Sequence, residues 1–322
     1  MIMIYSLTNG AVSTMRFVVL SALLALFSQG LMAQSYTKGQ HIEPAYEGWR
    51  PLPDGSFNFM FGYMNENWEE QPNVDIGENN SFAPGDPDRG QPTHFLPRRN
   101  RFTFEVNVPA DWGDRELVWT LSVNGVERKA YATLKSDYLV DNMVIASETG
   151  SLGAGTSSPE SRSNIAPIVT VRGDAIRTVR AGQAMKLDTL VEDDGLPTPT
   201  DVVAEAKRFA QFVGGPLAVA FVTPEAVSKR RLSSPPTRVT VNKVNGLFLS
   251  WNVYRGAGKV SFDPQLPKPW EDTRTSANSP WGALWVPPPV PADGMYEQTI
   301  TFEDPGTYVL WGRADDGGLY HD

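Results

Sequence analysis

The chain has 322 residues, with 28 Gly, 26 Pro, 9 Trp and no Cys, and its formal net charge is −9. Because 41% of the residues are hydrophobic and only 20% are charged, the chain can bury a core, and its length predicts about two domains. The Gly and Pro content is typical of a chain that turns often, and it excludes a helical bundle. The absence of Cys excludes disulfides, thiolate metal sites and thiol catalysis, and the negative net charge argues against nucleic acid as a partner.

An apolar run at residues 17–27 follows Arg16 near the N-terminus. The run is too short to span a hydrocarbon core of about 30 Å, and small or apolar residues follow it up to Ala33. This pattern predicts a signal peptide over residues 1–33 with cleavage after Ala33, and the alternative is an N-terminal membrane anchor. We therefore expect a secreted, periplasmic or cell-surface protein without a transmembrane span in the mature chain.

Strand signals dominate from residue 56 onward. Apolar residues recur with period two in residues 57–63 and 102–108, so each run presents one apolar face to a core. Alternating segments at 117–123 and 126–134 flank Asn124-Gly125, a dipeptide that accepts the positive φ angles of a two-residue hairpin turn. These runs predict a β-sandwich domain over residues 34–146, which resembles no family known to us.

Residues 147–163 are rich in Gly and Ser and contain no large cluster of apolar residues. Such a composition predicts a linker between two domains. The second domain, residues 164–322, again reads as strands, with one helix expected at 201–213. The overall prediction is an all-β protein of two β-sandwich domains.

The second domain resembles the PKD-like, immunoglobulin-type β-sandwich modules of secreted bacterial surface proteins over residues 164–317. Four segments carry the resemblance: NIAPIVTV at 164–171, AGQAMKLDTLVEDDGLPTP at 181–199, FLSWNVYRGAGKVSF at 248–262 and TFEDPGTYVLWGRADDG at 301–317. The resemblance implies an immunoglobulin-type sandwich with an insertion at 200–247. Only five residues follow the DDG turn at 315–317, so we expect a last strand that is missing or short, either truncated from a longer protein or completed by strand addition from a partner.

Two Asp-Asp-Gly sequences stand far apart in the chain but are expected at the same pole of such a sandwich. Four carboxylates at one pole repel each other unless a cation, Arg side chains or backbone N–H groups neutralise them. The candidate metal ligands, with calcium as the cation, are Asp193, Asp194, Asp315 and Asp316. The metal-free alternative is ordinary Asp-Gly turn chemistry.

A second acidic stretch, residues 51–88, contains eight carboxylates and no Lys or Arg. Its carboxylates could coordinate calcium, but they lack the spacing of an EF-hand. The alternative is an acidic surface that pairs with the arginines that follow, namely Arg89, Arg98, Arg99 and Arg101.

Three tryptophans lie in a Pro-rich stretch that ends at residue 291. Trp270, Trp281 and Trp285 could stack on sugar rings if they were exposed on a rigid loop, and glycan is then the expected ligand. The alternative is that these large aromatic side chains fill a core or cover a sheet edge.

No sequence motif of a common catalytic centre is present. The three histidines are not spaced as metal ligands, and no GxSxG, HExxH or phosphate-binding Gly loop occurs. We therefore predict a non-catalytic binding or structural module that contacts other surface or periplasmic proteins or polysaccharide. The alternative is a polysaccharide-active enzyme or its accessory subunit, because a pair of carboxylates suffices for glycoside hydrolysis.

Overall fold

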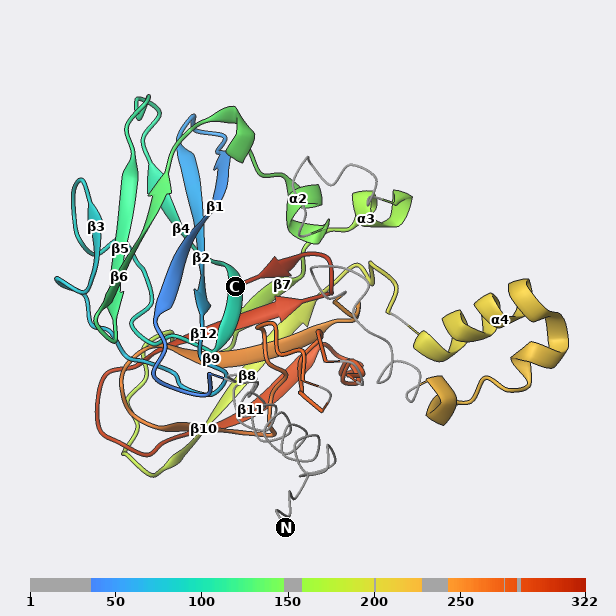
Figure 1. The fold of residues 1–322 in the computed structure, drawn as a ribbon. Helices are drawn as coiled ribbons and strands as arrows, with labels where there is room; N and C mark the ends of the chain where they lie inside the picture. The colour runs from blue at the N-terminus through green and yellow to red at the C-terminus, as the bar shows by residue number, and fades with distance from the viewer. Residues whose placement is uncertain (1–35, 148–157, 200, 228–242, 275, 283–284) are drawn as a thin grey trace, which may run out of the picture. The chain divides into compact units, whose positions relative to one another are not determined.

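The computed structural model describes residues 36–147, 158–199, 201–227, 243–274, 276–282 and 285–322. Residues Thr37–Asp322 form one compact unit, whereas the predicted signal peptide lies outside the described residues. The strands of the described residues form four sheets, all antiparallel, so the all-β prediction is confirmed (Figure 1). Within the described ranges, no helix is both long enough and apolar enough to cross a membrane.

The first half of the compact unit consists of two three-stranded sheets, with strand orders β1-β2-β4 and β3-β5-β6. Their bounds are β1 (Ile42–Pro51), β2 (Phe57–Asn65), β3 (Asn80–Ala83), β4 (Arg98–Val108), β5 (Leu117–Val123) and β6 (Val126–Ala132). One hydrophobic cluster joins the two sheets, because Phe59 and Phe61 of β2 pack in the same core as Phe82 of β3 and Trp119 of β5. The alternating apolar residues of the sequence therefore point inward from both sheets, except Phe102 of β4, which packs with Met60 in a separate cluster.

The hairpin expected around Asn124-Gly125 is confirmed in register. Val123 pairs with Val126, and the two turn residues have φ angles of 53° and 78°, as the turn requires. Leu117, Trp119 and Leu121 are fully buried on its inner face.

The second half also contains two sheets, with strand orders β10-β11-β8-β7 and β13-β12-β9. Their bounds are β7 (Ile168–Val171), β8 (Ala184–Glu192), β9 (Phe248–Arg255), β10 (Val260–Asp263), β11 (Met295–Phe302), β12 (Val309–Asp315) and β13 (Tyr320–His321). A second cluster with Leu187, Leu249 and Ile300 lies between these sheets. The last strand has two residues and pairs with the end of β12, so the expectation of a short last strand is confirmed.

The described helices are few. They are η2 (Ser136–Tyr138), α2 (Asn142–Ser147), α3 (Pro159–Ser163) and α4 (Val202–Val219). The helix expected at 201–213 is confirmed and extends further, with a kink at Gly215, where φ is 68°. The predicted linker at 147–163 ends in α3, and its residues 148–157 lie outside the described part of the chain.

The prediction of two separate domains is not confirmed, because the two halves share buried contacts. Leu96 of the first half packs with Trp270 and Trp311 of the second. Arg313 of β12 is 4% exposed and donates to the carbonyl oxygen of Phe102 in β4 at 2.7 Å. These contacts bury the surface along which separate domains would otherwise move.

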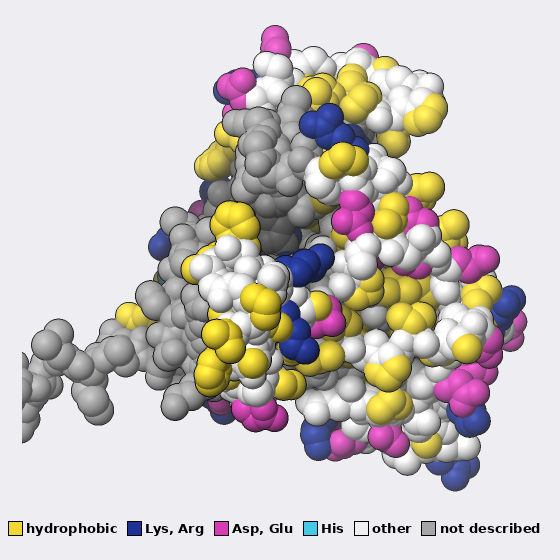
Figure 2. Space-filling view, turned by 90° about the vertical axis from the view of Figure 1, so that its right-hand side faces the viewer, with side chains coloured by type: hydrophobic (Ala, Val, Ile, Leu, Met, Phe, Trp, Pro, Cys, Tyr) yellow, Lys and Arg dark blue, Asp and Glu magenta, His cyan; other side chains and the backbone are white. Residues whose placement is uncertain are grey.

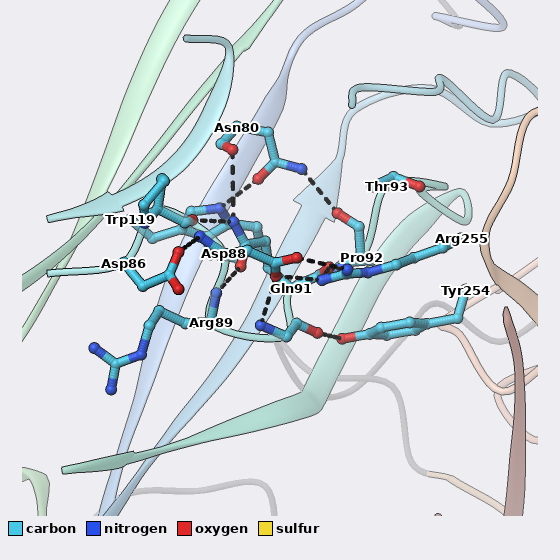
Figure 3. A network of polar contacts seen from close by, with 12 residues as sticks. Asn80, Asp86, Asp88, Arg89, Gln91, Pro92, Thr93, Trp119, Tyr254 and Arg255 are labelled. Atoms are coloured by element: carbon cyan, nitrogen blue, oxygen red, sulfur yellow. Dashed lines mark hydrogen bonds and ion pairs between the residues drawn. The ribbon is translucent and has the colours of Figure 1, made fainter. Parts of the chain in front are cut away.

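A polar network joins the loop at 86–93 to the end of β9 (Figure 3). The Arg255 guanidinium donates to both carboxylate oxygens of Asp88, at 2.9 and 2.7 Å, and to the carbonyl oxygen of Gln91. The Tyr254 hydroxyl donates to the carbonyl oxygen of Gly90 at 2.6 Å. The polar side chains of this network have hydrogen-bond partners within the protein, so the network holds the two halves together.

Candidate functional site

A pocket of about 550 Å³ opens at one pole of the second half, where the ends of its two sheets meet. Four segments form it: the end of β8 with the turn at 193–199, the residue before β9, the loop at 290–294 before β11, and the turn after β12. Its lining residues are Leu190, Val191, Glu192, Asp193, Gly195, Pro197, Pro199, Leu247, Val290, Pro291, Asp293, Gly294 and Asp316. The pocket therefore combines apolar walls with four carboxylates, and no Lys, Arg or His is among the described residues that line it.

Backbone contacts fix the segments around the pocket. The N–H of Gly246 donates to the carbonyl oxygen of Asp316 at 2.8 Å, and the N–H of Val191 donates to that of Gly294 at 2.9 Å. Gly294 has a φ of 70°, and a Cβ there would lie 2.6 Å from the carbonyl oxygen of Val191. Only glycine fits this approach without a shift of the backbone.

Asp316 is the most buried carboxylate in the pocket, with 1% of its surface exposed. Its Oδ1 accepts from the backbone N–H groups of Gly318 and Leu319, at 2.6 and 2.7 Å, whereas its Oδ2 has no hydrogen-bond partner. Burial, and then the charge of Asp315, raise the pKa of Asp316 to about 7, against the smaller opposing effect of these N–H groups. A carboxylate with a buried, unpaired oxygen is costly to the folded state.

Asn164 lies beside Asp316 and shares this incomplete pairing. Its side chain is buried, and a hydrogen-bond-like contact of this side chain with the carboxylate slightly lowers the pKa of Asp316. Neither Oδ1 nor Nδ2 of Asn164, however, meets a partner in hydrogen-bond geometry. The turn after β12 and the residue that follows α3 thus bring two incompletely paired polar side chains together beside the pocket.

Asp193 supplies a second carboxylate from the turn after β8. Its Oδ2 accepts from the N–H of Gly195 at 2.9 Å, and its Oδ1 is buried without a partner. Burial, joined by the charge of Asp194, raises the pKa of Asp193. The expectation that the two Asp-Asp-Gly turns lie at one pole is met by Asp193 and Asp316, which line the same pocket.

The other two predicted metal ligands point elsewhere. Asp315 pairs with Lys243, whose Nζ lies 2.6 Å from the carboxylate, because neighbouring residues at the end of a strand face opposite sides of the sheet. Asp194 accepts from the backbone N–H groups of Ile165 and Leu196. Among the described residues, no three His, Asp or Glu side chains lie close enough to hold a metal ion. The four carboxylates do not form one cluster, and calcium binding by them stays a prediction.

The acidic stretch at 51–88 pairs with arginines, but only partly with the expected ones. Arg98 lies 3.7 Å from Glu66, whereas Asp88 pairs with Arg255 and Glu69 lies 3.7 Å from Arg274. The partners of this stretch therefore include arginines that lie far away in the sequence.

The prediction of an exposed aromatic surface at Trp270, Trp281 and Trp285 is wrong, because these side chains are only 7, 5 and 6% exposed. Trp270 packs against Trp311 of β12, and Trp285 packs against Phe248 of β9. Large apolar rings gain more from covering a sheet than from facing water. Buried rings cannot stack on a sugar, so these tryptophans form no glycan platform.

Helix α4 carries exposed apolar side chains (Figure 2). The most exposed are Phe209, Phe212, Val213 and Leu217, and Phe221 follows the helix. Exposed apolar clusters of this kind mark contact surfaces in other proteins, but nothing in the structure shows what covers this one.

Comparison of the chain with models of protein families, with curated proteins and with solved structures finds no match. The resemblance of residues 164–317 to PKD-like modules therefore stays a prediction that rests on the sequence segments alone. For the pocket, the sequence indicates the aspartates but gives no signal for the apolar walls at Leu247 and Val290, or for Asn164 beside Asp316.

Proposed function

We propose that the chain is an exported, non-catalytic binding module at the cell surface or in the periplasm, and that the pocket at the pole of its second half binds a cationic ligand. The observation that carries the proposal is the Asp316 carboxylate, which lines a pocket of about 550 Å³ with a buried oxygen that has no partner. A cation placed there supplies both a counter-charge and, if it bears N–H groups, the missing donor. The size of the pocket is that of a site for a small molecule or a side chain.

The polar network in Figure 3 supports the choice of site by contrast. Arg255 and Tyr254 meet acceptors within the protein, so that network needs no ligand. At the pocket, Asp193 and Asp316 each keep an oxygen that the protein does not pair. A buried polar group that the protein leaves unpaired needs an explanation, and a bound ligand is one.

The test is thermal unfolding of the purified chain with a panel of cations at millimolar concentration: calcium chloride, an N-acetyl lysine amide and an N-acetyl arginine amide. A ligand that binds only the folded state at about ten times its Kd should raise the Tm by about 3 °C. The Asp316→Asn variant, which keeps the shape but not the charge, should show no rise. An equal rise in both proteins, or no rise with any cation, contradicts the proposal.

A polysaccharide-active enzyme remains the second candidate, and one observation favours it. A carboxyl with a pKa near 7 in a pocket with another carboxylate has the properties of a general acid. The second carboxylate would be that of Asp193, whose pKa is also raised by burial and by the charge of Asp194. Release of reducing sugar from polysaccharides by the wild type, lost in Asp316→Asn, would favour the enzyme.

A further inference from the structure

The residues that line the pocket indicate which kind of ligand it can bind. Leu190, Leu247 and Val290 line it together with three prolines, whereas the buried carboxylate of Asp316 and the partly buried carboxylate of Asp193 stand among these apolar groups. An ion alone would leave the apolar walls in contact with water. A ligand that fills such a pocket has an apolar body and a charged end.

Calcium fits these donors poorly. The ion takes six to eight oxygen ligands, usually with several carboxylates. Within the described part of the chain, no three acidic or His side chains lie close enough to share one ion. Asp316 and Asp193 each keep one buried oxygen without a hydrogen-bond partner, and the other oxygen of each carboxylate already accepts from backbone N–H groups.

An aliphatic stem that ends in a cation meets both requirements. The side chains of Lys and Arg lay their methylene groups along apolar surface while the charged head keeps polar contacts. An ammonium or guanidinium head donates N–H groups to a carboxylate oxygen at short distance, in a charge-assisted hydrogen bond. The unpaired Oδ2 of Asp316 is such an acceptor.

We infer that the pocket binds the side chain of a Lys or Arg residue presented by a partner protein, with its cationic head at Asp316 and its stem along Leu247 and Val290. This inference rests on the proposed function and names the ligand class of the same pocket. Glu192 and Asp293, which are exposed at the pocket, extend its negative charge toward the approaching partner.

The affinity should depend on pH. The charged groups around Asp316 are the carboxylates of Asp315, Asp193, Glu192 and Asp293, with Lys243 paired to Asp315. The negative charge of Asp315 helps to hold the pKa of Asp316 near 7 in the free protein. Since only the ionised carboxylate attracts the cation, binding should strengthen by about tenfold between pH 6 and pH 8.

The experiment is a calorimetric titration of the purified chain with four probes. N-acetyl lysine methylamide and N-acetyl arginine methylamide have both an aliphatic stem and a cationic head. N-acetyl norleucine methylamide has an aliphatic stem without a charge, and calcium chloride supplies a cation without a stem. We expect the lysine or arginine probe to bind at least tenfold more tightly than the norleucine probe, and Asp316→Asn to weaken it by tenfold or more. Asp194→Asn, which removes the same charge from a residue that does not line the pocket, is the matched control and should change the affinity less than twofold.

Each other result has a distinct meaning. Binding of calcium without binding of either cationic probe overturns the inference but leaves the proposed function intact. Equal binding of the lysine and norleucine probes overturns the inference, because the cation would then contribute nothing. Failure of all four probes, with no change of Tm, overturns both the inference and the proposed function.

Discussion

Replacement of Asp316 by Asn is expected to stabilise the protein, by about 4 kcal/mol near pH 8 and by about 2 kcal/mol near pH 5. The buried carboxyl has a pKa near 7 in the folded chain and an ordinary value of 3.8 when exposed. Between these two values the folded state binds more protons than the unfolded state, so the free energy of unfolding falls as the pH rises. Asn removes the charge and keeps an oxygen that can accept from the N–H groups of Gly318 and Leu319.

Urea unfolding of both proteins across this pH range measures the effect, and a second buried aspartate provides the control. Asp272 is fully buried, but hydrogen bonds from Arg274 and Lys268 outweigh the effect of burial and lower its pKa to about 2. Asp272→Asn should therefore destabilise the protein at neutral pH, by about 2 kcal/mol. Loss of stability in both variants would show that Asp316 is paired like Asp272 and has no free oxygen to offer a ligand.

Replacement of Trp119 by Ala is expected to cost about 4 kcal/mol of unfolding free energy. The side chain is fully buried in the first core, where its ring stacks on Phe82, with centroids 5.8 Å apart, and meets Phe104 edge-on at 5.1 Å. Its Nε1–H also donates to Oδ1 of Asn80 at 3.0 Å. Truncation removes these contacts and leaves a cavity between the sheets.

Trp119→Phe separates the two contributions, because it keeps an aromatic ring and loses the hydrogen bond. We expect it to cost about half as much as the Ala substitution, in part because Asn80 then lacks its donor. Chemical unfolding monitored by circular dichroism provides the measurement for both variants. A cost below about 1 kcal/mol for Trp119→Ala would mean that this core does not hold the first half together.

Local chemistry made part of this fold predictable. The hairpin at β5 and β6 was predicted in register because Asn124-Gly125 has a strong preference for one turn and the flanking residues alternate. Strand β1 gave no such signal, since its sequence IEPAYEGWRP interrupts the alternation with Pro and Gly. It is held instead by pairing with β2, a contact between residues that the pattern of either strand alone does not show.

The candidate site was harder to predict, because it depends on which way each side chain points. Topology placed Asp193 and Asp316 at one pole, but the direction of β12 sends Asp315 to the other face of the sheet, toward Lys243. Composition likewise does not show whether Trp281 is exposed or buried, because its burial depends on how its loop packs.

The central claim is that a cation binds the ionised carboxylate of Asp316, and NMR of the side-chain carboxyl carbon tests it most directly. The chain is labelled at aspartate and the Asp316 signal, assigned by its absence in Asp316→Asn, is followed with pH in the presence and absence of N-acetyl lysine methylamide. The account predicts a pKa near 7 in the free protein and a fall of about one unit or more when the probe is bound. A pKa that is the same with and without saturating probe would contradict it.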